Sequence, residues 1–202
     1  MTTVANSARV ASMKIFVTSD CPYSHQNILK YEPNRPGSNV DEMNEILFDN
    51  WNSVVSSCDE VYILGDFAMG LRTRVPEYWN RLNGRKHLIF GNHDQRKNFD
   101  FVETTLKHEI LEYHRDVLRE KPILFIHDPH RALEMDLSKY SAVFSGHVHS
   151  LWKLKKAGET LDNSHGEVFN PLPCPIPFLN VGVDVHNYFP ILLEDAIAMV
   201  SL

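Results

Sequence analysis

Five short apolar runs divide the chain, and each ends close to a polar side chain. The runs cover residues 15–18, 61–64, 87–90, 123–126 and 142–144. Apolar runs of four to eight residues that are bounded by turn residues are typical of buried strands. We therefore expect these five segments to be strands of one or more sheets.

Helical periodicity separates the first two runs. We expect a helix over residues 41–55, with Asp41 as its N-cap, because the apolar residues recur at helical spacing: Met43, Ile46, Leu47, Trp51 and Val54. A strand, a covering helix and a second strand form a βαβ unit. The sheet that contains this unit is therefore expected to be at least partly parallel.

The rest of the chain predicts a mixed second half. We expect a strand over residues 109–118 to pair with the run at 123–126 as an antiparallel hairpin. An irregular, proline-rich connection over residues 155–178 is expected to lie over the mouth of a site. The remaining expected elements are helices at 27–31, 75–82, 99–107 and 193–199 and a final strand at 178–185.

Length and charge exclude several classes of protein. The chain has 202 residues, of which 43% are apolar, and its net charge is −6 without a long basic run. A broad nucleic-acid surface is therefore not expected. We expect a single domain over residues 13–202, preceded by a disordered leader at 1–12.

The three cysteines, Cys21, Cys58 and Cys174, show no paired spacing. They are expected to be reduced thiols of a cytoplasmic protein rather than disulfide or zinc-finger cysteines. No apolar segment is long enough to cross a membrane, so no membrane partner is expected.

Metal-competent side chains occur at the end of every apolar run. The donors are Asp20, Asp66, Asn92, His127 and the pair His147 and His149. Carboxylate, amide and imidazole donors in this number suit a site for two divalent ions. The same residue types also occur in ordinary turns, so the repetition at five strand ends is what favours a metal site.

In order and spacing, these motifs resemble the calcineurin-like metallophosphoesterases of the small bacterial and phage type. The matching segments are Thr18-Ser19-Asp20, His25-Gln26-Asn27-Ile28, Asn34-Arg35-Pro36, Asn50-Trp51-Asn52, Leu64-Gly65-Asp66-Phe67, Leu82-Asn83-Gly84-Arg85, Gly91-Asn92-His93-Asp94, His127-Asp128-Pro129, Gly146-His147-Val148-His149 and Asn180-Val181-Gly182-Val183-Asp184-Val185. The resemblance covers nearly the whole chain from Met13. It implies an α/β fold, a four-layer αββα sandwich of two mixed sheets flanked by helices.

The resemblance also implies a role for each motif residue. Asp66 would bridge two ions, with Asn92, His127 and His147 on one ion and Asp20 and His149 on the other. His93 would stabilise the transition state or protonate the leaving group, and Asp94 would orient the ring of His93.

The chemistry implied is hydrolysis of a phosphodiester or phosphomonoester by metal-bound water or hydroxide. Mn²⁺ is the expected ion, and Fe, Zn, Ni, Co and Mg are the alternatives. The expected substrate is a small phosphoester, with nucleotide-like molecules included.

One position departs from the family pattern. The family's first motif is Asp-x-His, but Pro22 stands two residues after Asp20 and has no donor atom. Water could replace the missing ligand, or Cys21, Tyr23 or His25 could, with His25 the best donor. Alternatively, a single ion could be held by the other ligands.

Two further alternatives stay open at this point. Arg35 could contact a phosphate, but its neighbours Asn34 and Pro36 equally mark a loop fixed by hydrogen bonds. The fold could also belong to a non-catalytic binding or scaffold protein with a degenerate metal site. The presence of both His93 and Asp94 argues against a scaffold.

Overall fold

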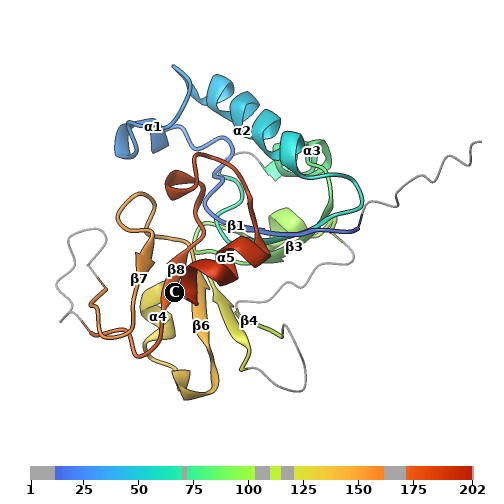
Figure 1. Ribbon diagram of the computed structural model, residues 1–202. Coiled ribbons are helices and arrows are strands. Elements are labelled where there is room, and N and C mark those ends of the chain that lie inside the picture. The colour runs from blue at the N-terminus through green and yellow to red at the C-terminus, as the bar shows by residue number, and fades with distance from the viewer. Residues whose placement is uncertain (1–11, 70–71, 103–109, 115–120, 162–171, 202) are drawn as a thin grey trace, which may run out of the picture.

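The computed structural model describes residues 12–69, 72–102, 110–114, 121–161 and 172–201. Two β-sheets lie face to face, and helices cover their outer sides (Figure 1). The expected leader at residues 1–12 lies outside the described residues except for Ser12. No helix among the described segments is long and apolar enough to cross a membrane.

The first sheet has the strand order β3-β2-β1-β9. Its strands are β1 (Ile15–Thr18), β2 (Glu60–Leu64), β3 (Arg85–Ile89) and β9 (Ile191–Leu192). Strands β1, β2 and β3 are parallel, and β9 joins β1 in the antiparallel sense. The expected βαβ unit is confirmed, whereas no pattern in the sequence predicts the two-residue strand β9.

The second sheet has the order β4-β5-β6-β8-β7. Its strands are β4 (Ile110–Tyr113), β5 (Ile123–Ile126), β6 (Ala142–Ser145), β7 (Leu154–Lys155) and β8 (Phe178–Asn180). Strands β5, β6 and β8 are parallel, while β4 and β7 are antiparallel edge strands. The expected β4–β5 hairpin pairing is confirmed, and residues 109 and 115–118 of that prediction lie outside the described residues.

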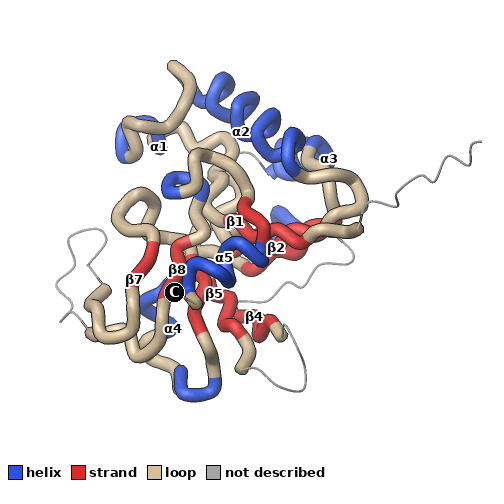
Figure 2. Tube along the Cα trace, in the orientation of Figure 1, coloured by secondary structure: helices blue, strands red, loops and turns tan. Residues whose placement is uncertain are grey.

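The helices are α1 (Ile28–Tyr31), α2 (Val40–Val54), α3 (Val75–Arg81), α4 (Pro129–Ala132) and α5 (Leu193–Val200). Short 3₁₀ helices occur at Arg72–Arg74, Arg96–Phe99, Leu137–Lys139 and Val183–Val185. Helices α2 and α3 lie on the side of the first sheet that faces away from the second sheet (Figures 1 and 2). Helix α5 contacts β1, β8 and β9 and so touches both sheets.

Alternation along the strands creates three apolar layers. On β2, Val61 and Ile63 pack toward α2 and α3, while Leu64 faces the second sheet. On β5, Phe125 faces the first sheet and Leu124 packs outward with α4. Successive side chains of a strand point to opposite faces. The four-layer αββα sandwich is therefore confirmed.

Three local expectations need correction. Helix α2 is capped by Asn39, whose side chain accepts the Glu42 N–H at 2.9 Å, so Asp41 lies in the first turn rather than at the cap. The segment 99–102 is not α-helical, because the 3₁₀ helix ends at Phe99 and a turn follows; residues 103–107 of that predicted helix lie outside the described residues.

The third correction concerns the strand expected at residues 178–185, which is β8. It ends at Asn180 rather than at Val185, because the Asn180 side chain accepts the N–H of Gly182 at 2.8 Å and turns the chain into a 3₁₀ helix. The described part of the 155–178 connection lies beside Leu133 and Leu137, and none of it lines the candidate site.

Candidate metal centre

The two sheets bring the carboxyl ends of their parallel strands to one place. Asp20 and Asp66 follow β1 and β2, Asn92 follows β3, and His127 and His147 follow β5 and β6. The N–H of His147 donates a hydrogen bond to Asp20 Oδ2 at 2.9 Å and so ties the two sheets together. Ligands commonly bind beyond the carboxyl ends of parallel strands.

His127 shows why this cluster suits a cation. Its Nδ1 lies 2.8 Å from the Leu64 carbonyl, which only accepts, so Nδ1 carries a proton. Its Nε2 then faces two oxygen acceptors, Asn92 Oδ1 at 2.9 Å and Asp66 Oδ2 at 3.3 Å. Nε2 and the two oxygens can be satisfied in either of two ways. Nε2 can carry a proton that the oxygens accept, or a metal ion can lie between the three atoms.

A fourth donor joins the same group. Nδ1 of His147 lies 3.2 Å from Asn92 Oδ1, and the His147 ring meets that of His127 edge-on. Donor atoms that bind one ion at about 2.0–2.2 Å lie roughly 3 Å from their neighbours. Asn92 and His147 therefore lie next to His127 at a spacing that suits neighbouring ligands, while the acidic and histidine donors that all lie within 4.8 Å of one another are those of Asp20, Asp66 and His127.

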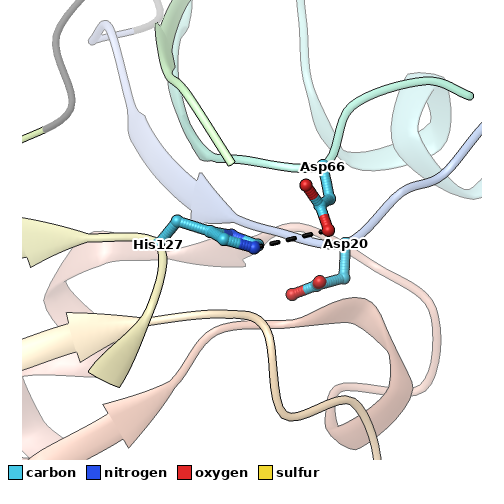
Figure 3. Close-up of side chains that lie close together, drawn as sticks. All are labelled: Asp20, Asp66 and His127. Carbon is cyan, nitrogen blue, oxygen red and sulfur yellow. Dashed lines mark ion pairs between the residues drawn. The ribbon is translucent and has the colours of Figure 1, made fainter. Parts of the chain in front are cut away.

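Asp20 supplies an independent sign of a second position. The residue is fully buried, and its Oδ1 has no hydrogen-bond partner among the described residues. Buried polar atoms without a partner are rare and require an explanation. Donor atoms of Asp20, Asp66 and His127 lie within 4.8 Å of one another, and Figure 3 shows the three side chains converging. A cation beside Asp20 would satisfy the unpaired oxygen.

His149 is held by a buried ion pair. Its Nδ1 lies 3.1 Å from Asp184 Oδ2, so in the neutral ring the lone pair lies on Nε2. Burial alone would lower the pKa of His149, but the Asp184 hydrogen bond and the charge of Asp20 raise it. Both oxygens of Asp184 accept hydrogen bonds from Arg35, at 2.8 and 2.6 Å.

Arg35 lies beneath the site rather than in it. The side chain is fully buried, and Nη2 also donates to the backbone carbonyl of Asp20 at 3.0 Å. Its Nε and Nη2 are paired with Asp184 and the Asp20 backbone, its Nη1 is buried without a hydrogen-bond partner among the described residues, and Arg35 does not line the pocket, so the alternative of a direct phosphate contact is corrected. Its position supports the alternative, in which Arg35 fixes a loop.

Strained backbone marks four of the expected ligands. Among the described residues, seven that are not glycine have positive φ, and they include Asp20, Asp66, His147 and His149. Such conformations cost about 1–3 kcal/mol each and persist where the surrounding structure enforces them. They also concentrate at functional sites, which is the pattern here.

Two glycines allow the loops to approach this closely. A Cβ on Gly91 would collide with the carboxylate of Asp66, and one on Gly146 would collide with Asp20 and with Ser19. Only a residue without a side chain fits at either position. The Gly-Asn-His-Asp and Gly-His-Val-His motifs therefore begin with glycine for steric reasons.

His93 and Asp94 do not make the contact expected of them. The Asp94 carboxylate accepts backbone hydrogen bonds from Asp66, Phe67 and Gly91, at 2.8, 3.0 and 2.9 Å. Among the described residues, no hydrogen bond joins the Asp94 carboxylate to the ring of His93. Burial and the charge of Asp66 raise the pKa of Asp94 to about 6, against the effect of its N–H donors. Asp94 therefore positions Asp66 through its backbone, which corrects the expected orientation of His93.

The three expected substitutes for the missing ligand differ sharply. Cys21 is buried, and burial raises the pKa of its thiol to about 12. Tyr23 lies in the core with its ring stacked on Phe48. Neither reaches the site without leaving the core, so these two expectations are corrected. Pro22 is also buried and offers no donor.

His25 is the substitute that lines the site. Its Nδ1 accepts the Asn27 N–H at 3.2 Å, and its ring meets that of His93 edge-on with centroids 6.4 Å apart. Burial and nearby His93 lower the pKa of His25, so the ring is neutral at pH 7 with its proton on Nε2. Together with Asp66, Asn92, His93, His147 and His149, it borders a pocket of about 710 Å³.

Sequence reasoning missed the structural role of Asn180. This fully buried residue donates to the carbonyls of His149 and Trp152, both at 2.8 Å, and so holds the loop that carries His149. The segment from Asn180 to Val185 is among those that resemble the family, and this resemblance is the signal in the sequence that points to Asn180. The Asp184–Arg35 pair was equally hidden, since the two residues are far apart in the sequence.

Metal binding is expected to depend on pH through His127. Burial alone would lower the pKa of His127, but the hydrogen bond and charge of Asp66 raise it to about 9. The ion pair between His127 and Asp66 therefore stabilises the folded, chelator-treated protein. Its contribution is complete at pH values below the unperturbed pKa of about 6.5 and is lost as the pH rises through about 9. Metal must displace the proton on Nε2.

We therefore expect the apparent Mn²⁺ affinity of chelator-treated protein to rise about tenfold between pH 7 and pH 8, with release of about one proton. Calorimetric titration in two buffers of different ionisation enthalpy measures both quantities. An affinity that is independent of pH would show that His127 does not exchange a proton for the ion.

Comparisons with known proteins find similarity along most of the chain. The model of the calcineurin-like phosphoesterase superfamily domain matches residues 13–175. An uncharacterised protein of Methanocaldococcus jannaschii is 31% identical over 190 residues, which are 93% of this chain and 92% of that protein. The gene 66 protein of Mycobacterium phage L5 is 27% identical over 163 residues, 77% of each chain.

A solved structure shares the fold. The crystal structure of a protein of unknown function from Aquifex aeolicus matches with a TM-score of 0.66 and 22% identity, covering 94% of this chain and 100% of that chain. At this identity the likeness concerns the fold alone.

Proposed function

The chain belongs to the calcineurin-like phosphoesterase superfamily, and from this premise we propose that it hydrolyses a phosphoester with the help of divalent metal ions. One observation carries the proposal. Strand ends from two sheets bring donor atoms of Asp20, Asp66 and His127 within 4.8 Å of one another, and Oδ1 of Asp20 has no hydrogen-bond partner among the described residues. Asn92 lies beside His127, and His147 lies beside Asn92. Mn²⁺ is the ion we propose, and the cytoplasm is the location.

The metal ions would supply Lewis-acid activation of water and would neutralise charge that develops on phosphate oxygens. The chain's own residues supply negative charge, hold one another in position and provide a proton donor. Asp66 brings negative charge to both ion positions, and the backbone N–H of His93 holds its Oδ1 at 3.0 Å. The exposed ring of His93 lines the pocket, where it can donate a proton to an oxygen of the substrate.

The direct test is hydrolysis of bis(4-nitrophenyl) phosphate and 4-nitrophenyl phosphate by chelated protein to which Mn²⁺ has been added back. We expect turnover that disappears with EDTA and returns with Mn²⁺. A folded protein that turns over neither ester with any divalent ion would contradict the proposal and favour a scaffold. Phosphodiesters and other small phosphoesters are the proposed substrates, not extended nucleic acid, because the chain is acidic.

The second ion position is expected to be the weaker one. It has Asp20, Asp66 and His149 as ligands, and Pro22 adds nothing where the family has a histidine. We expect Pro22→His to raise the Mn²⁺ content toward two ions per chain, because it restores an imidazole at this position. Elemental analysis after dialysis measures the change.

The control for this variant is Pro22→Ala, which removes the proline without adding a donor. It is expected to leave the Mn²⁺ content as in the original protein. Equal metal contents in the alanine and histidine variants would contradict the assignment of Pro22 to the missing ligand position.

A further inference from the structure

The lining of the pocket of about 710 Å³ is of two kinds. Metal-site residues and His93 are polar, whereas Ile28, Tyr31, Val148 and Leu151 add apolar side chains. The volume lies in the range of about 300–1,000 Å³ that is usual for pockets binding small molecules. A substrate that fills the pocket must therefore place an organic group against the apolar side chains.

Two of the apolar residues that line the pocket are exposed, Tyr31 and Leu151. Tyr31 is 71% exposed and Leu151 is 47% exposed, and they are two of the six large apolar side chains of the described residues that remain exposed. Tyr31 comes from α1 and Leu151 from the loop after His149, so two distant segments bring them to the same pocket. Single exposed apolar residues are ordinary, but their convergence beside a polar site is typical of binding surfaces.

Aromatic rings link Tyr31 to His93. The ring of His25 meets both the Tyr31 ring and the His93 ring edge-on, with centroids 6.4 Å apart in each pair. A planar group that packs against Tyr31 therefore lies close to His25 and to the polar residues of the site. This arrangement suits an ester whose phosphate lies at the metal centre and whose ring lies at the rim.

The charges of the lining residues limit the phosphate itself. Glu32 adds a carboxylate to the lining, and no lysine or arginine occurs among the described residues that line the pocket. The second negative charge of a phosphomonoester would therefore find no lysine or arginine side chain in this lining to offset it. A phosphodiester carries one charge and avoids this cost.

We propose that the surface formed by Ile28, Tyr31 and Leu151 binds a planar, uncharged ring of a phosphodiester, and that Tyr31 is the main specificity residue. The inference rests on the proposed function, because it assumes that the phosphate lies at the metal centre. Aromatic contacts of this kind have large, specific energies for their area.

The test compares two diesters with the same leaving group, bis(4-nitrophenyl) phosphate and methyl 4-nitrophenyl phosphate. The two diesters differ only in the ester group that stays on the phosphate, which is 4-nitrophenyl in one and methyl in the other. The ratio of their kcat/KM values therefore measures the preference for a ring at that position. Tyr31→Ala is expected to lower this ratio by roughly 5- to 100-fold, as expected for a lost stacking contact. Leu151→Ser is expected to lower it less, while Tyr31→Phe should leave it unchanged.

The matched control is Leu172→Ser, because Leu172 is 54% exposed and does not line this pocket. It is expected to keep the original ratio. Glu32→Gln is expected to raise the activity toward 4-nitrophenyl phosphate relative to the diester. An unchanged ratio in both Tyr31→Ala and Leu151→Ser would overturn the inference.

A binding measurement separates this inference from the proposed function. Diphenyl phosphate and dimethyl phosphate each carry one negative charge, as the proposed substrate does, and their binding can be measured without turnover, so their dissociation constants can be compared by calorimetry with Mn²⁺ present. Tighter binding of diphenyl phosphate that is lost in Tyr31→Ala supports the ring site even if no ester is hydrolysed. Equal binding of the two would overturn the ring site even in an active phosphoesterase.

Discussion

Asp66→Asn is expected to abolish metal-dependent activity, with kcat/KM lowered by roughly 10³-fold or more. The change keeps the shape of the side chain but removes the charge that both ion positions share. In the original protein, Asp66 Oδ2 lies 3.3 Å from His127 Nε2. In the variant an uncharged amide group occupies this position in place of a charged carboxylate. Mn²⁺ content by elemental analysis and hydrolysis of bis(4-nitrophenyl) phosphate measure the two effects.

Asp128→Asn is the matched control for this variant. It makes the same chemical change one residue after His127, at a position that caps α4 by accepting the His130 N–H at 2.8 Å. Asparagine caps helices about as well as aspartate. We expect metal content and turnover close to those of the original protein. A fully active, metal-loaded Asp66→Asn protein would overturn the assignment of the site.

His93→Ala is expected to lower kcat by about 10²–10⁴-fold while metal content stays near normal. The metal site should survive because His93 supports Asp66 through its backbone N–H, which alanine retains. Stopped-assay kinetics with Mn²⁺, together with elemental analysis, separates the loss of a proton donor from the loss of the ion.

His25→Ala is the corresponding control, because its ring also lines the pocket and lies edge-on to His93. A much smaller decrease in kcat is expected for this variant. If His25→Ala lowers kcat more than His93→Ala does, the proton donor is His25, and the role proposed for His93 is wrong. Full activity of His93→Ala would remove that residue from the mechanism.

Local pattern was enough to predict most of the secondary structure. The strands that carry the site are short, apolar and closed by turn residues, and α2 has a complete apolar stripe. The predictions failed where a side chain competes with the backbone. Asn39 caps α2, and Asn180 ends β8 with its own side-chain hydrogen bond. Such bonds depend on which conformation the surrounding chain allows.

The sequence alone determined the identities and order of the donor residues, and hence the expectation of a metal site. Glycine at positions 91 and 146 and a donor after each buried strand are local requirements that can be read along the chain. The absence of a donor at Pro22 is equally a fact of the sequence.

Tertiary structure decided which of these residues meet and what each one does there. In the folded chain, Arg35 is buried against Asp184, and Asp94 accepts a hydrogen bond from the backbone of Asp66. Tyr23 lies in the core, whereas His25 and Tyr31 line the pocket. The physical reason is that these contacts join segments far apart in the chain, and their geometry follows from how two sheets pack. No local pattern contains that information.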